Sequence, residues 1–303
     1  MPMHRLTSTD AFLVVDLPGA TSASGIVRCA RKILPDGAEL LARSVTYAAA
    51  SFDAAVSGAS AGINAEGDAR DAAVAAFVDE VPTLIPEIRL ELSAGKGVRA
   101  DELSGAAFPP GQPGDRERLI AAGAVAAAIA ALGSLDGRTI AVEAVPGVTA
   151  AVVERLADTG AVLTDGAEPA PAADVWFVGS KVGLIDHDLA ARIQSRLIVP
   201  IGPLPVTARG LAVARRADVV VLPDFLTCAG PLLAGLLAGA LALDDGATPP
   251  ASGELDAHVA DRIGAAVARV LDHEHGPLLG ACFAAETFLA TWVDQLPFGR
   301  PLA

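Results

Sequence analysis

Short apolar runs alternate with helix-like segments between residues 139 and 223, and this alternation constrains the fold more than any other feature. The runs read TIAVEAV, AVLTD, DVWFVG, RLIVPIG and DVVVLPD. The helix-like segments among them are Val148 to Thr159, Asp186 to Ser195 and Thr207 to Ala214. Because continuous apolar strands separated by helices are typical of a parallel sheet covered on both faces, we predict a Rossmann-like, doubly wound α/β domain.

The segment before this domain shows a second α/β pattern. Its strand-like runs are AFLVVDL, GIVRCA and EIRLELSA, and its helical stretches are Asp36 to Ala50 and Asp68 to Val81. Proline and glycine concentrate in residues 108–115, where we place the domain boundary, and Asp115 is placed to cap a helix from Arg116 to Leu132. The predicted parts are an N-terminal α/β domain (1–115), the Rossmann-like domain (116–245) and C-terminal helices (246–303), which run from Glu254 to His273 and from Leu279 to Val293.

Composition supports a globular protein of two domains. The chain has 303 residues, of which 52% are hydrophobic and 19% charged, enough for a sizeable core. Its 36 acidic and 22 basic residues give a net charge of −14, which repels nucleic acid and anionic lipid headgroups. We therefore expect neither a nucleic-acid partner nor a membrane partner.

Cysteine usage predicts a reducing compartment. Cys29, Cys228 and Cys282 are odd in number and widely spaced, which argues against a disulfide framework and a zinc site, and we expect a cytoplasmic protein without a targeting segment. The uncharged stretch from Phe225 to Leu243 is as long as the ~20 residues of a membrane span. Pro231 and three glycines favour a loop that leads into a buried helix instead.

The strand and helix in VEAVPGVTAAVVERL stand where a Rossmann fold places its phosphate-binding turn. The three glycines of the GxGxxG fingerprint are replaced by Ala144, Pro146 and Thr149. Pro146 removes an amide donor and brings a ring where phosphate approaches, although the amides at the helix start, Gly147 and Val148, remain able to hold an anion. A dinucleotide, NAD or NADP, is thus favoured by the position of this turn and disfavoured by its residues.

Other polar residues have two readings each. Asp165 ends the next strand and is placed to bind an adenosine ribose, but it equally fits a turn or a helix cap. The clusters Asp186-His187-Asp188 and His273-Glu274-His275 lack the i, i+4 spacing of helical metal ligands, so we predict no metal site.

Lysine is scarce, with only Lys32, Lys96 and Lys181 in the chain, so a mechanism with two lysines in one pocket is strained. Lys96 precedes Asp101 and Glu102, and this group either performs acid–base chemistry or forms a solvated turn.

Five segments together resemble the glutamate, leucine, phenylalanine and valine dehydrogenases, in the order of that family and over residues 25 to 292. SGIVR is similar to the family's GGxR strand, and SVTYAAASFDAAVSGASAGI (44–63) matches MTYKNAAAGLxLGGGKxxI without a gap. SLDGRTIAVEAVPGV resembles LxGKxVAVQGxGNV, VVVLPDFLTCAGPLL resembles VxPDxxxNAGGV, and HEHGPLLGACFAAETF resembles the closing helix. The resemblance implies NAD(P)-dependent oxidation of amino acids, a substrate in the cleft between the domains, C-terminal helices that pack back across that cleft, and homo-oligomers.

The differences from the family fall on its chemical groups. The lysine that holds the substrate carboxylate matches Ala48, and the catalytic lysine matches Ser60. The assisting aspartate falls at Glu102, or at Asp101 with a shift of one residue, and the cofactor-side asparagine is Cys228. Losing the charged clamp costs ~1.5–3 kcal/mol in binding, so ordinary amino-acid deamination is not expected.

Two functions remain open at this point. The first is a divergent NAD(P)-dependent oxidoreductase that uses Asp101 or Glu102 as acid–base with Ser60 nearby, and Arg28 or Lys96 for its substrate. The second is a non-catalytic scaffold or binding protein that keeps the dehydrogenase fold. We favour the first, because a two-domain cleft is costly to retain without a ligand. The first predicts nucleotide binding, and the second predicts either no binding or binding without turnover.

Overall fold

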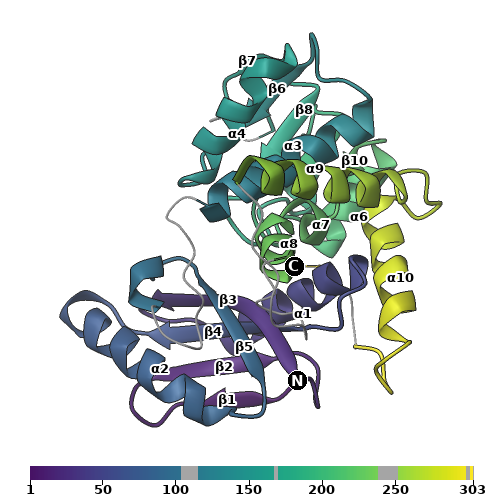
Figure 1. Cartoon of the computed structure of the whole chain (residues 1–303). Helices are drawn as coiled ribbons and strands as arrows, with labels where there is room; N and C mark the ends of the chain where they lie inside the picture. Colours follow the sequence, from purple (N-terminus) through teal and green to yellow (C-terminus); the bar gives the residue numbers. More distant parts are fainter. Residues whose placement is uncertain (104–114, 167–169, 238–251, 298–300, 303) are drawn as a thin grey trace. The chain divides into compact units, whose positions relative to one another are not determined.

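The computed structural model describes residues 1–103, 115–166, 170–237, 252–297 and 301–302 (Figure 1). The chain forms two compact units. Unit 1 comprises Met1–Pro113, Gly235–Thr248 and Phe288–Pro301, and unit 2 comprises Gly114–Ala234, Pro249–Thr287 and Leu302–Ala303. Most of the predicted boundary segment, residues 108–114, and most of the predicted loop from Asp244 to Gly253 lie outside the described residues.

Unit 1 is a five-stranded mixed sheet with one long helix on each face (Figure 1). The strand order is β1-β2-β4-β3-β5, in which β3, β4 and β5 are parallel while β1 and β2 are antiparallel to their neighbours. Its elements are β1 (Met3–Arg5), β2 (Ala11–Val15), β3 (Ser22–Ala30), α1 (Pro35–Ser51), β4 (Ser57–Asn64), η1 (Gly67–Ala69), α2 (Arg70–Leu84), β5 (Arg89–Ala94) and η2 (Ala100–Leu103). The predicted α/β layer is therefore confirmed.

Strand β4, in the middle of this sheet, was not predicted as a strand. Its sequence, SGASAGIN, has a single β-branched residue, so it lacks the usual strand composition. Small residues stand there because α1 packs directly on the strand: a Cβ at Gly58 would lie 1.7 Å from the carbonyl oxygen of Ala42 in α1. The close approach of a helix, which no local pattern encodes, selects this composition.

Unit 2 contains a five-stranded, fully parallel sheet with the order β10-β9-β8-β6-β7. This confirms the predicted Rossmann-like fold. Its elements are α3 (Asp115–Leu132), β6 (Thr139–Val142), α4 (Val148–Leu156), η3 (Ala157–Thr159), β7 (Val162–Thr164), β8 (Val175–Val178), α5 (His187–Ala190), β9 (Leu197–Pro200), α6 (Ala208–Arg216), β10 (Val220–Val221), α7 (Asp224–Thr227), α8 (Gly230–Leu237, which ends in unit 1), α9 (Ser252–Ala268) and α10 (Pro277–Leu289, whose last residues belong to unit 1).

Helix α9, one of the predicted C-terminal helices, packs along α3 (Figure 1). A Cβ at Gly123 of α3 would lie 2.3 Å from Cδ1 of Ile263 in α9, so the glycine permits the close approach. Asp256 of α9 also forms ion pairs with Arg118 of α3 and Arg155 of α4. These contacts attach α9 to the sheet domain of unit 2.

The predicted helix from Asp186 to Ser195 is wrong in length. Helix α5 ends at Ala190, and the chain turns at once to enter β9. The N–H groups of Arg192 and Ile193 donate to carbonyls only three residues back, and the hydroxyl of Ser195 donates to the carbonyl of Pro171 at 3.2 Å, so the α-helical pattern is lost before Ser195.

The apolar stretch from Phe225 to Leu243 forms α7 and α8 as far as it is described, to Leu237. Within the described residues, no helix has the length and apolar character that crossing a bilayer requires.

A buried ion pair joins the end of β2 to α1. Nε of Arg43 donates to both carboxylate oxygens of Asp16, at 2.9 and 2.8 Å, and the side chains are 8% and 0% exposed. Two charges removed from water stabilise a fold only while both are present, because either one alone is a buried charge without compensation.

We expect Arg43→Met to lower the free energy of unfolding by about 3–5 kcal/mol, because it leaves the Asp16 carboxylate buried without a positively charged partner. Urea denaturation measures the change. Arg31→Met is the matched control, since the Arg31–Glu66 pair joins side chains that are 85% and 66% exposed and such pairs contribute about 1 kcal/mol or less. Equal losses in the two variants would contradict the interpretation.

Candidate functional site

In the sheet of unit 2, the direction in which successive strands are added reverses between the neighbouring strands β6 and β8. From β6 the chain moves outward to β7 on one side, and from β8 it moves outward through β9 to β10 on the other. In open parallel sheets, ligands bind beyond the carboxyl ends of the strands at such a switch point. The residues that follow β6 and β8 are therefore the first candidates for a site.

Glu143 follows β6 directly and reaches across to the end of β8. Its Oε2 accepts the backbone N–H groups of Gly179 and Ser180, at 2.8 and 2.9 Å, and its Oε1 accepts the hydroxyl of Ser180. The carboxylate thus satisfies both backbone donors at the end of β8. The sequence analysis missed Glu143, and the available signal was an acidic residue directly after a buried strand.

The turn between β6 and α4 is closed by Thr149, at the third position of the fingerprint. Its hydroxyl oxygen accepts the N–H of Val145 at 2.7 Å, and the hydroxyl lies 2.7 Å from the carbonyl of Glu143. Pro146 has no N–H to offer. The hydroxyl of Thr149 therefore occupies the N–H of Val145, a donor that a phosphate bound in this turn would need.

The start of α4 faces a second carboxylate. Gly147 has a φ of +76°, which favours glycine, and it precedes the buried Val148. A Cβ at Gly147 would lie 2.8 Å from Cγ and 3.8 Å from Oε1 of Glu117, so the Glu117 side chain lies beside this exposed residue. A negative charge therefore lies at the helix start, where an anion would otherwise bind.

These residues disfavour a dinucleotide. Its pyrophosphate needs free backbone donors and a positive potential. Here Thr149 occupies the N–H of Val145, Pro146 has no N–H, and the carboxylates of Glu143 and Glu117 repel an anion.

The two remaining cofactor-side candidates lie at the same edge of the sheet. Asp165 is exposed and follows β7, next to β6: a Cβ at Gly166 would lie 2.1 Å from the carbonyl oxygen of Val142. The Cys228 thiol donates to the carbonyl of Pro200, at the end of β9, over 3.7 Å. Burial, and then the carboxylate of Asp224, raise the pKa of this thiol to about 12, so it stays neutral and is a poor nucleophile.

In unit 1, the two positions that match family lysines lie on the α1 side of the sheet. Ala48 belongs to α1 and is buried. Ser60 of β4 pairs with Val14 and Ile26, and Val14 belongs to the core under α1, so Ser60 points to the same side. Its hydroxyl is buried and, among the described residues, has no hydrogen-bond partner.

The same face carries two charged groups with buried atoms that make no hydrogen bond among the described residues. Arg28 of β3 pairs with Gly62 on this face, and its Nε and Nη2 are buried without a hydrogen bond within the described part of the chain. Glu91 of β5 pairs with Ser24 of β3, and its Oε2 is likewise buried without a hydrogen bond among the described residues. Burial lowers the pKa of Arg28, and burial raises the pKa of Glu91 against the opposing effect of Arg89. Glu91 is a second residue that the sequence analysis missed.

The predicted acid–base group lies on the opposite face. Glu102 pairs with Arg70 at the start of α2, and Leu103 belongs to the core under α2. The hydrogen bonds from Arg70 lower the pKa of Glu102 to about 2. Asp101 is exposed and pairs with Arg99 at 3.3 Å, and Lys96 is exposed as well. The structure thus brings Arg28 and Ser60 to one face and places Glu102 on the other.

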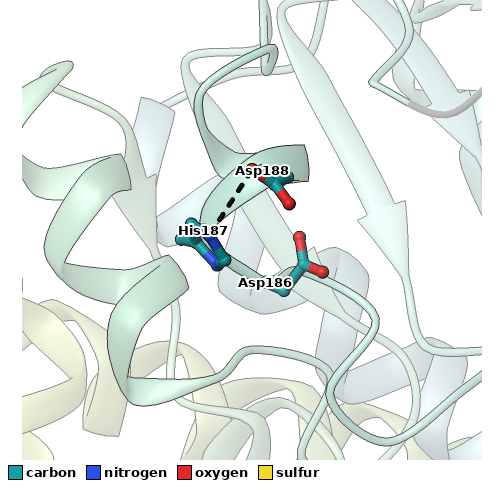
Figure 2. Close-up of side chains that lie close together, drawn as sticks. All are labelled: Asp186, His187 and Asp188. Atoms are coloured by element: carbon teal, nitrogen blue, oxygen red, sulfur yellow. Dashed lines mark ion pairs between the residues drawn. The ribbon is translucent and has the colours of Figure 1, made fainter.

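Figure 2 shows the cluster Asp186, His187 and Asp188, whose potential ligand atoms lie within 4.8 Å of one another. All three residues are exposed. Asp186 caps α5 by accepting the N–H of Leu189 at 2.9 Å, and His187 lies 3.5 Å from Asp188. Helix capping explains the position of Asp186 without a metal ion.

The sequence matches no protein-family model and no curated protein. Solved structures do match. The L-tryptophan dehydrogenase from Nostoc punctiforme is 16% identical with a TM-score of 0.67, and the alignment covers 96% of each chain. The hetero-hexameric glutamate dehydrogenase from Thermus thermophilus is 20% identical, with a TM-score of 0.74 over 92% of this chain and 83% of that one.

The glutamate dehydrogenase of Plasmodium falciparum has a TM-score of 0.76 at 12% identity, over 93% of this chain and 79% of its own. The resemblance found in the sequence is therefore confirmed at the level of structure, and the chain has the fold of the amino-acid dehydrogenases.

Proposed function

We propose that this protein is a non-catalytic, small-ligand binding protein built on the amino-acid dehydrogenase fold. The observation that carries the proposal is the carboxylate of Glu143, which occupies the backbone donors of Gly179 and Ser180 at the switch point of the sheet. Its negative charge stands directly before the turn at which a dinucleotide-binding fold holds the pyrophosphate, and it repels that group.

The residues of unit 1 support the same proposal. Ala48 and Ser60 provide no ammonium group where the family has lysines, and Glu102 is committed to Arg70. A carboxyl group with a pKa of about 2 is a weak base at neutral pH. Among Ala48, Ser60 and Glu102, no pair combines a proton acceptor with a group that holds a substrate carboxylate.

The competing function is a divergent NAD(P)-dependent oxidoreductase. The similar structures are dehydrogenases, which favours this function, as does the parallel sheet with its switch point. An oxidoreductase of this kind requires that Glu143 and Thr149 give up their hydrogen bonds to backbone N–H groups when a nucleotide binds there. A nucleotide titration therefore decides between the two functions.

The ligand of the proposed binding protein is best sought at Arg28, Ser60 and Glu91. A partly buried charge without a partner destabilises the free protein, and a bound ligand of opposite charge removes that cost. A guanidinium group binds carboxylates through two parallel hydrogen bonds. We propose a small organic carboxylate that also has a polar group for Glu91.

The three free cysteines support our proposal of a reducing, cytoplasmic compartment. One of the similar structures is described as hetero-hexameric, and we propose that the present chain forms a homo-oligomer.

We expect no saturable response to NAD, NADH, NADP or NADPH at about millimolar concentration, in thermal-shift and calorimetric titrations of the purified protein. Ligand binding to the native state must raise the melting temperature. A saturable response to any one of the four would overturn the non-catalytic proposal and favour the oxidoreductase.

We expect Arg28→Met to stabilise the free protein in urea denaturation, because it removes a desolvated charge without a partner. The same variant should lose the thermal shift that a screen of small carboxylates produces with the unaltered protein. Lys96→Met, which removes an exposed cation of the same unit, should change neither quantity. An equal loss of the thermal shift in both variants would argue against Arg28 as the ligand-binding group.

Light scattering should give the mass of at least two chains in solution. A mass of 30.5 kDa, that of one chain, would contradict the homo-oligomer.

A further inference from the structure

The carboxylate of Glu143 lies at the switch point of the sheet, where a ligand would bind. It follows β6, while its two backbone partners, Gly179 and Ser180, follow β8, the neighbouring parallel strand. The hydrogen bonds therefore cross the line from which the chain diverges to the two sides of the sheet. This is the place where an open parallel sheet receives a ligand from solution.

The donors around Glu143 form an anion site. Two successive N–H groups point at a single oxygen, Oε2, and the hydroxyl of Ser180 binds the other oxygen. Successive backbone N–H groups directed at one point bind anions, phosphate groups among them. A carboxylate satisfies these donors as an anion from solution would.

The surrounding backbone holds these donors in place. A Cβ at Gly179 would lie 2.3 Å from the N of Gly202, in the segment that follows β9, so only glycine fits there. The N–H of Ile201 donates to the carbonyl of Val178 at 2.8 Å, which keeps the ends of β8 and β9 together. The anion site is thus fixed by the sheet and persists when Glu143 is replaced.

We propose that Glu143 is a built-in anion that fills the switch-point anion site and closes it to phosphate-containing ligands. The inference deepens the proposed function and rests on it, because it gives the reason why a dinucleotide does not bind. Glu143 determines specificity by occupying the donors, and its removal opens the site to an external anion.

The test compares Glu143→Ala with the unaltered protein, using inorganic pyrophosphate as the probe in isothermal titration calorimetry. Glu154→Ala is the matched control: Glu154 is exposed on α4 in the same unit, and its replacement removes the same charge without freeing a backbone donor. We expect Glu143→Ala to bind pyrophosphate at least tenfold more tightly than either the unaltered protein or Glu154→Ala. In NMR spectra of this variant, the amides of Gly179 and Ser180 should shift on titration.

Equal affinities in Glu143→Ala and Glu154→Ala, with Glu143→Ala folded by circular dichroism, would overturn the inference. Amide hydrogen exchange in the unaltered protein provides a second measurement that needs no variant: Gly179 and Ser180 should exchange slowly, and unprotected exchange at both would also overturn it. Dinucleotide binding by the unaltered protein, in contrast, contradicts the proposed function, so the two failures are distinguishable.

Discussion

Backbone N–H groups at the carboxyl end of a parallel strand have no partner within the sheet, and the acceptor that they find decides much about this protein. At the end of β8 the acceptor is the side chain of Glu143. In the turn after β6 it is the hydroxyl of Thr149. The N–H of Gly179 is buried, and buried donors must be satisfied, so the carboxylate of Glu143 serves there as an acceptor that the chain itself supplies.

The two units differ in how their candidate sites are filled. In unit 2, the side chains of Glu143 and Thr149 bind backbone donors at the switch point. In unit 1, Ala48 and Ser60, the positions that match family lysines, provide no cation on the α1 side of the sheet. Arg28 and Glu91 remain on that side as charged groups without partners among the described residues. Because such groups destabilise the free protein, their presence supports the proposal that this face binds a ligand.

The spacing of apolar residues and the positions of proline, glycine and capping residues predicted most of the secondary structure. Both sheets and the long helices follow from apolar runs, helical spacing and capping residues, which act over a few neighbouring positions. The failures have a different origin. Strand β4 consists of small residues because α1 packs against Gly58, and α5 ends early in a turn whose Ser195 hydroxyl binds the carbonyl of Pro171. Both depend on residues that are distant in the sequence, so no local pattern reveals them.

The sequence by itself predicted which chemistry is missing: Ala48 and Ser60 match family lysines, and Pro146 and Thr149 stand at glycine positions of the dinucleotide fingerprint. Only the tertiary structure decided what takes the place of that chemistry. Glu143 and Ser180 are 37 residues apart and meet because β6 and β8 are neighbours in the sheet. Glu102 and Ser60 are separated because they belong to opposite faces. The order of strands in a sheet, and the face to which each side chain points, are set by the packing of whole elements. For this reason the sequence reveals which residues a site contains but not how they are arranged.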